Sequence, residues 1–91
     1  YEQAAAQGHA DAEASLGVLY ELGRSVQRDY EEARQWYEKA AAQGHAKARA
    51  YLAELYERGL GGPRKMKSAL ELYAQAAAQG VAAARLALVR L

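Results

Sequence analysis

A five-residue motif, Ala-Ala-Ala-Gln-Gly, recurs three times in this 91-residue chain at a constant spacing. It occupies residues 4–8, 40–44 and 76–80, so each copy begins 36 residues after the previous one. Residues 10–45 align with residues 46–81 without a gap and are identical at 16 of the 36 positions. A fixed period of this length is typical of folds built from stacked units, because one short unit cannot bury its apolar face alone.

Each unit has the apolar spacing of two amphipathic helices. In the first helix, Ala12, Leu16, Leu19 and Tyr20 recur three and four residues apart and share one face. Gly23 follows, and glycine readily adopts the left-handed conformation that commonly ends a helix. The composition agrees, because Ala, Leu, Glu, Gln, Lys and Arg favour helices and β-branched residues are scarce.

The second helix of the unit has a comparable apolar stripe and ends at Gly44. Stacking of the two helices predicts an all-α solenoid in which the following residues are mutually buried: Leu16, Tyr20, Ala33, Trp36, Tyr37 and Ala40. Tyr56 and Tyr73 are expected to be core residues at the equivalent places. The predicted elements are a fragment over 1–7 that ends at Gly8, and helices near 10–22, 29–43, 46–58, 65–79 and 82–91.

Two stretches of the first unit carry a family resemblance. Ala12 to Gly23 reads Ala-x-x-x-Leu-Gly-x-x-Tyr-x-x-Gly, and Trp36 to Gly44 reads Trp-Tyr-x-x-Ala-Ala-x-x-Gly. This pattern resembles the Sel1-like repeat, a relative of the tetratricopeptide repeat, along the whole chain. The resemblance implies a right-handed α/α superhelix of antiparallel helix pairs. It also implies an adaptor role in protein complexes, of the kind frequent in bacterial surface, secretion and signalling systems.

The second unit departs from that pattern at several positions. Ala53 replaces the Gly that follows Leu, and Leu72 replaces Trp. Lys65 and Met66 stand where the first unit has Asp-Tyr. These departures bear on tight packing within the second unit rather than on the fold.

Composition excludes several classes of function. The chain has no Cys, so it has no disulfide, thiolate metal site or Cys nucleophile. No apolar run approaches the roughly 18–20 residues of a membrane span. The net charge of +1 is too small to indicate nucleic acid or an anionic membrane as the partner. Cytosol, periplasm and secretion all remain compatible with a Cys-free chain.

The two histidines raise the possibility of a metal site. His9 and His45 occupy the same position in successive units, but no third ligand recurs beside them, and the third unit has Val81 there. Both are therefore predicted to be solvated turn residues. We expect no metal and no cofactor.

Catalysis is also not expected. Ser15, Ser25 and Ser68 lack the sequence context of a nucleophile elbow. The adjacent carboxylates Glu31 and Glu32 point about 100° apart on a helix and cannot flank one substrate. Cysteine-rich relatives of the Sel1-like repeat imply a second possibility, a β-lactam-binding hydrolase, against which the absence of Cys argues.

The segment 59–67 is Gly-rich, basic and directly precedes a helix. It lacks the spacing of a nucleotide-binding P-loop, and Pro63 suits an ordinary loop before a first helical turn. Arg64, Lys65 and Lys67 place positive charge at the positive end of that helix, which is locally unfavourable. This cost favours an acidic partner for the loop.

The predicted function is a non-catalytic scaffold that binds a partner peptide or helix on the concave face of the first helices; a structural spacer in a longer array is the alternative. Positions turned away from the Leu16–Tyr20 stripe are expected to line that face together with Ala14 and Ala50. Tyr51 replaces Ser15 of the first unit and is expected near the edge as a surface contact. The predicted binding residues are Asp11, Val18, Glu21, Leu22, Lys47, Tyr51, Glu54, Glu57 and Arg58.

The last helix and the charge distribution favour self-association. Leu86, Leu88, Val89 and Leu91 are apolar and have no later helix in this chain to cover them. Residues 1–45 contain eight acidic and four basic residues, a net charge of −4, and residues 46–91 contain three acidic and eight basic residues, a net charge of +5. End-to-end association of two copies is therefore expected.

Overall fold

The computed structural model describes the backbone of residues 2–91 and the side chains of residues 9–91. This part of the chain forms five helices and no strand, which confirms the all-α prediction. The helices are α1 (Glu2–Leu22), α2 (Tyr30–Ala42), α3 (Ala46–Arg58), α4 (Met66–Ala78) and α5 (Ala82–Arg90). The boundaries of α2 to α5 lie within one residue of those predicted from the sequence.

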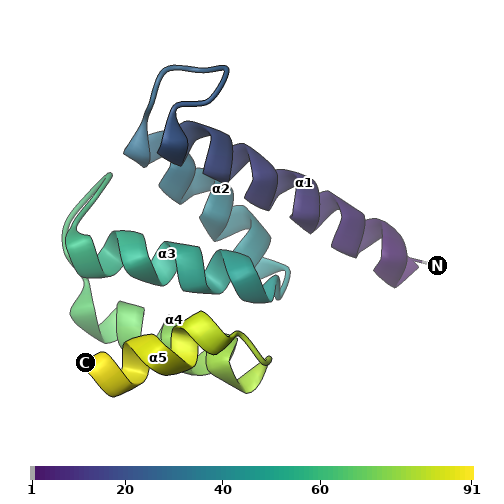
Figure 1. Cartoon of the computed structure of the whole chain (residues 1–91). Coiled ribbons are helices and arrows are strands. Elements are labelled where there is room, and N and C mark those ends of the chain that lie inside the picture. Colours follow the sequence, from purple (N-terminus) through teal and green to yellow (C-terminus); the bar gives the residue numbers. More distant parts are fainter. Residues whose placement is uncertain (1) are drawn as a thin grey trace.

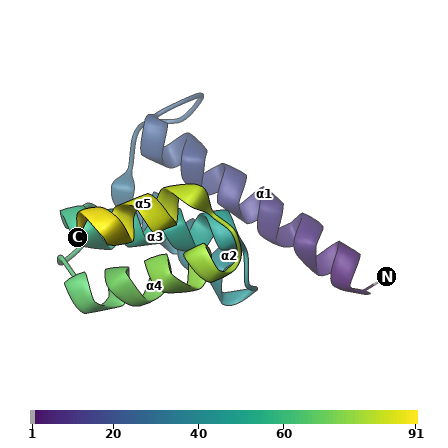
Figure 2. The same ribbon diagram turned by 60° about the horizontal axis from the view of Figure 1, so that its bottom comes forward.

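The prediction that Gly8 ends a separate helical fragment is wrong. Helix α1 continues through Gly8, so the predicted fragment and the helix near 10–22 form one element. Packing of α3 against α2 and of α5 against α4 stabilises the turns at Gly44 and Gly80. The beginning of α1 instead projects away from the other helices (Figure 1, Figure 2). A glycine inside a helix costs only about 1 kcal/mol, so continuation preserves the backbone hydrogen bonds at little expense.

The helices form two layers. The first helices of the units, α1, α3 and α5, lie in front in Figure 1, and α2 and α4 lie behind them. Each helix packs against its neighbour in sequence, in the order α1, α2, α3, α4, α5. This stepwise packing is the arrangement of a solenoid, as the sequence period predicts.

Tyrosines and alanines dominate the core. Tyr37, Tyr73 and Leu55 are the largest fully buried side chains, and Ala33 and Ala40 are completely buried beside them. The predicted burial is confirmed for Ala33, Tyr37, Ala40, Tyr56 and Tyr73. The expectation of full burial is wrong for Leu16, Tyr20 and Trp36, which are partly exposed.

Their place in the stack explains this exposure. The counterparts of Leu16 and Tyr20 are Leu52 and Tyr56, which are buried because α3 packs between α2 and α4. Helix α1 lies at one end of the described stack and packs against α2 on one side only. Trp36 lies at a position that is partly exposed in both units, and the ammonium of Lys39 lies 4.4 Å from the centroid of its ring.

The replacement of glycine by Ala53 does not loosen the packing of the second unit. Ala53 is completely buried, and Tyr73 beside α3 is 2% exposed. At the equivalent Gly17, an added Cβ would lie 2.5 Å from Cε1 of Tyr37, so the first unit requires glycine there. The second unit thus accommodates a methyl group where the first cannot.

Candidate protein-binding face

Two hollows lie along the layer of first helices. The α1–α3 groove has a volume of about 240 Å³, and the larger α3–α5 groove has a volume of about 420 Å³. The α1–α3 groove is lined by Asp11, Ala14, Ser15, Val18, His45, Lys47 and Tyr51. The α3–α5 groove is lined by Glu54, Glu57, Arg58, Ala83, Leu86, Ala87 and Arg90.

Seven of the nine residues predicted for the binding face line one of these grooves. The structure brings Asp11, Val18, Lys47 and Tyr51 together in the first, and Glu54, Glu57 and Arg58 in the second. Glu21 and Leu22 line neither groove, although Leu22 is 47% exposed at the end of α1. The predicted residues therefore divide between two grooves, one beside the first half of α3 and one beside its second half.

The sequence predicted Tyr51 near the edge of the face, and the structure places it in the lining of the α1–α3 groove. Its side chain is half-buried within the α1–α3 groove, and its ring centroid lies 5.3 Å from that of Tyr37. The expectation that Ala50 lines the face is wrong, because Ala50 is 7% exposed and belongs to the core. Ala14 is 5% exposed and forms only the floor of the groove.

A repeated hydrogen bond joins the two helices of each unit. The hydroxyl of Tyr37 donates to Oε1 of Glu21 at 2.6 Å, and the hydroxyl of Tyr73 donates to Oε1 of Glu57 at 2.7 Å. Burial raises the pKa of both tyrosines well above the ordinary value, and the neighbouring carboxylates raise it further. Glu21 and Glu57 thus serve the fold, and Glu57 also lines the α3–α5 groove.

A similar bond joins consecutive units. The hydroxyl of Tyr56 on α3 donates to Oε2 of Glu38 on α2 at 2.8 Å. Burial, and then the hydrogen bond to Glu38, raise the pKa of Tyr56 to about 12. Tyrosine hydroxyls therefore donate hydrogen bonds both within a unit and between consecutive units.

The glutamine of the repeated motif also makes tertiary hydrogen bonds, between units at Gln79 and within a unit at Gln43. Nε2 of Gln79 donates to the backbone oxygen of Gly44 at 2.8 Å, and Oε1 of Gln79 accepts from Arg49 at 2.9 Å. Gln43, at the equivalent position, donates to the buried Glu13, which is the counterpart of Arg49. These bonds account for the glutamine of the motif that revealed the repeat.

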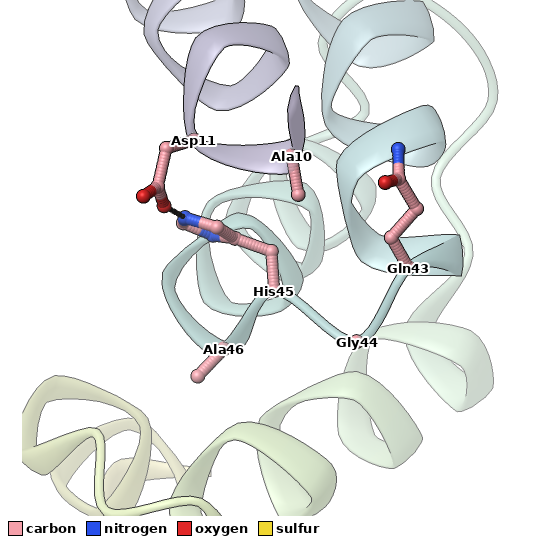
Figure 3. A pocket seen from close by; sticks show the side chains of 6 residues that line it. All are labelled: Ala10, Asp11, Gln43, Gly44, His45 and Ala46. Carbon is pink, nitrogen blue, oxygen red and sulfur yellow. Dashed lines mark hydrogen bonds and ion pairs between the residues drawn. The ribbon is translucent and has the colours of Figure 1, made fainter. Parts of the chain in front are cut away.

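His45 is not a solvated turn residue. Its Nδ1 accepts the backbone N–H of Ala48 at 3.0 Å and thereby caps the start of α3. The proton of the neutral ring must then be on Nε2, which donates to Oδ1 of Asp11 at 2.6 Å (Figure 3). In the next unit, Lys47 and Val81 replace this pair together, and α5 has no side-chain cap.

This geometry bears on catalysis and on metal binding. Ser15 lines the same groove as His45, but both ring nitrogens are occupied, so the imidazole cannot take a proton from the serine. His9 lies 3.5 Å from a carboxylate oxygen of Glu13 on its own helix. Over residues 9–91, no group of three or more His, Cys, Asp or Glu residues is arranged to hold a metal ion.

Arg34 was missed by the sequence reasoning. Its side chain is 7% exposed, and its Nη2 donates to the backbone oxygens of Leu55, Leu60 and Pro63. Its guanidinium carbon lies 4.6 Å from the ring centroid of Tyr56. Arg34 therefore holds the α3–α4 loop (residues 59–65) against α2. In the sequence, the only indication of this role was that Arg34 is replaced by Leu70 at the same position of the next unit.

The basic residues predicted to bind an acidic partner lie outside both grooves. Arg64, Lys65 and Lys67 are exposed on the α3–α4 loop and the first turn of α4. The ammonium of Lys65 lies 5.4 Å from the centroid of Tyr56, on which Arg34 also packs. Lys65 does not cap α4, whereas Asp29 accepts the N–H of Glu32 at the start of α2.

Comparison with known proteins identifies the class of this helical solenoid. The family model for the Sel1 repeat matches residues 1–9, 10–45 and 46–81. The chain belongs to the Sel1 repeat family. Proteins of this family are generally non-enzymatic scaffolds for protein–protein interaction. Among residues 2–91, every helix is too short or too polar to span a lipid bilayer.

Several solved structures are similar to the chain. A Sel1 repeat protein from Oxalobacter formigenes has a TM-score of 0.84 and 40% identity over 87% of this chain and 32% of its own. The uropathogenic Escherichia coli protective antigen c5321, which displays the same repeat fold, has a TM-score of 0.82 and 35% identity over 86% of this chain and 17% of its own.

The cysteine-rich protein B of Helicobacter pylori has a TM-score of 0.77 and 27% identity over 82% of this chain and 56% of its own. The chain thus spans between 17% and 56% of the length of these three structures. No curated protein matches the chain in sequence.

Proposed function

We propose that residues 1–91 act as one non-catalytic Sel1-like repeat domain, which binds a partner peptide or helix along the first-helix face (the surface of α1, α3 and α5 with its two grooves). One observation carries the proposal. Most core positions, and the tyrosine–glutamate pairs Tyr37–Glu21 and Tyr73–Glu57, are identical between units, whereas several groove-lining positions differ: Asp11 corresponds to Lys47, Val18 to Glu54, and Ser15 to Tyr51. Although Asp11 bonds to His45, the helices stack with either residue of each pair, so these positions are available to recognise a partner.

The chemistry of the grooves suits a polypeptide. Tyr51 and Val18 provide apolar contact in the α1–α3 groove, and Leu86 is 71% exposed in the α3–α5 groove. Lys47, Glu54 and Arg58 add charges of both signs along the same face. Such a surface binds through its half-buried aromatic and apolar groups, while exposed charges mainly accelerate association.

Site-specific photo-crosslinking tests the face directly. A photoreactive residue would be placed at Lys47 or Leu22 on the first-helix face, and at Glu71 on the opposite layer as the matched control, in the intact parent protein in its own cells. We expect a crosslinked protein partner from the first two positions and none from Glu71, which is exposed on α4. Crosslinks from Glu71 alone would place the binding surface on the other layer. No crosslink from any position would favour a structural spacer.

Charge reversal gives a second test. The double change Glu54→Lys with Arg58→Glu should weaken partner binding while circular dichroism shows unchanged helix content. Unchanged binding would contradict the assignment of the face.

Self-association is proposed for the isolated 91-residue chain. Leu86, Val89 and Leu91 are 71%, 86% and 46% exposed, whereas Leu88 packs against the core. With charges of −4 and +5 on the two halves, light scattering at high protein concentration should show oligomers that dissociate as salt is added. A strict monomer at low salt would contradict this.

A further inference from the structure

Glu54 is a carboxylate of the first-helix face that the fold does not use. Its side chain is half-buried in the middle of α3 and lines the α3–α5 groove. Glu21 accepts the hydroxyl of Tyr37, and Glu57 accepts both the hydroxyl of Tyr73 and the guanidinium of Arg90. Glu54 makes no hydrogen bond or ion pair with any side chain of residues 9–91.

The surroundings of Glu54 disfavour its charge. Partial burial raises the pKa of Glu54, Arg58 lowers it, and the nearby Glu21 and Glu57 raise it again. A partly desolvated carboxylate without a bonding partner costs free energy in the folded state. Glu54 is therefore present despite its effect on stability.

The repeat register shows that stacking does not require a carboxylate here. The counterpart of Glu54 is Val18 in the first unit and Arg90 in α5. Val18 is partly buried and packs against the core, so an apolar side chain fits this position. The counterparts Glu21 and Glu57, in contrast, are identical and make the same bond in both units.

We propose that Glu54 is the recognition residue for a cationic side chain, arginine or lysine, of the peptide that binds the first-helix face. This inference rests on the proposed function. The charges around the site are three carboxylates (Glu21, Glu54 and Glu57) and two guanidiniums (Arg58 and Arg90), which sum to −1. Because Arg90 is already bonded to Glu57 at 2.9 and 3.2 Å, a partner cation would balance the remaining charge.

The surface beside Glu54 suits the rest of such a side chain. Leu86, Ala83 and Ala87 form the α5 wall of the groove, where the methylene stem of an arginine or lysine can lie. A guanidinium can donate two parallel hydrogen bonds to a carboxylate, which favours arginine over lysine. The neighbouring α1–α3 groove, with Tyr51, then accepts an apolar residue of the same peptide.

Selection from random peptides tests the proposal and does not require the natural partner. A display library of random 12-residue peptides would be selected in parallel on the 91-residue wild-type chain and on Glu54→Gln, Glu71→Gln and Tyr51→Ser. We expect arginine or lysine to be enriched about tenfold at one position of the wild-type pool relative to the Glu54→Gln pool. Glu71→Gln, a carboxylate change on the opposite layer, should select the wild-type motif.

The variants separate failure of this inference from failure of the proposed function. Equal cation content in the wild-type and Glu54→Gln pools would overturn the role of Glu54. In that case, loss of binding to Tyr51→Ser would still support the first-helix face. Failure to enrich peptides on any variant would overturn both proposals.

A stability measurement provides an independent check. Glu54→Val copies the residue of the first unit and should leave the Tm unchanged or raise it, while removing the preference for a cation. A clearly lower Tm for Glu54→Val would show that the carboxylate serves the fold, and would overturn the proposal.

Discussion

Substitution of Arg34 by Met tests how one unit holds the next. Nη2 of Arg34 lies 2.9 Å from the backbone oxygen of Leu60, and 3.3 and 3.4 Å from those of Pro63 and Leu55. Methionine has a flexible apolar side chain that fills irregular gaps but has no donor. The change should therefore release the α3–α4 loop while leaving the core of each helix pair intact.

The expected loss of stability can be bounded from these contacts. Two N–H groups on Nη2 make one good and one weaker charge-assisted bond, and such bonds contribute roughly 1.5–3 kcal/mol each. The cation–π contact with Tyr56 adds about 1 kcal/mol. Nε of Arg34 is buried and has no partner in residues 9–91, which offsets about 1–3 kcal/mol. We expect a net loss of about 2 kcal/mol, or a Tm lower by roughly 8–16 °C for a domain of this size.

Urea denaturation and amide hydrogen exchange would measure this effect. The amides of Leu60, Gly61, Gly62, Arg64 and Lys65 should exchange faster in Arg34→Met, with little change within α1. Arg28→Met is the matched control, because Arg28 is exposed and lies 5.8 Å from the ring of Tyr30. A loss below about 0.5 kcal/mol, the usual range of surface substitutions, together with unchanged exchange would refute the role assigned to Arg34.

Three further predictions address the backbone and the ionisable groups. Gly61→Ala should destabilise the chain more than Gly80→Ala in urea melts. Both glycines have positive φ, so the backbone strain is comparable. A Cβ at Gly61, however, would lie 2.4 Å from the backbone oxygen of Tyr30, whereas one at Gly80 would meet nothing within 4 Å. The pKa of Tyr56 is raised from about 10 in the unfolded chain to about 12 in the folded one. The protonated phenol therefore contributes fully to the free energy of unfolding below pH 10, and this contribution is lost as the pH rises from 10 to 12. In this range, Tyr56→Phe should reduce the fall of the free energy of unfolding by about 1.4 kcal/mol per pH unit. Hydrogen bonds from Arg90 and Tyr73 lower the pKa of Glu57 in the folded chain. Its carboxylate therefore stabilises the fold above the pKa of the unfolded chain, and this stabilisation is lost as the pH falls through the pKa of the folded chain. On acid titration the Tm of Glu57→Gln should fall less than that of the wild type, and an equal fall would argue against these bonds.

The fold was predictable from the sequence because its determinants are local. Apolar residues three and four apart define each helix, and glycines at Gly23, Gly44 and Gly59 coincide with its ends. The burial of Tyr37 and Tyr73 follows from the same stripe. Periodicity alone did not predict that α1 continues through Gly8. A glycine ends a helix only where the next helix packs back against it, as at Gly44 and Gly80.

The site was predictable only in part, because its geometry depends on contacts between distant residues. The bond of His45 to Asp11 spans 34 residues, and those of Arg34 to the α3–α4 loop span 21 to 29 residues. No spacing within one helix indicates such pairs. Comparison between units would have helped, because Lys47 and Val81 replace Asp11 and His45 together.

The same comparison separates the residues that build the repeat from those available for binding. Glu21 and Glu57 were assigned to the face from helical geometry, yet they are identical between units and each accepts a buried tyrosine hydroxyl. The other predicted face residues all differ from their counterparts: Asp11, Val18, Leu22, Lys47, Tyr51, Glu54 and Arg58. Removal of Glu21 or Glu57 should therefore impair folding and binding together, because a buried phenol would lose its acceptor. Among the face residues that differ between units, Asp11 bonds to His45 and Tyr51 packs against Tyr37, so their removal should also affect stability. Removal of Glu54, which is partly desolvated and has no bonding partner among the described side chains, should impair binding alone.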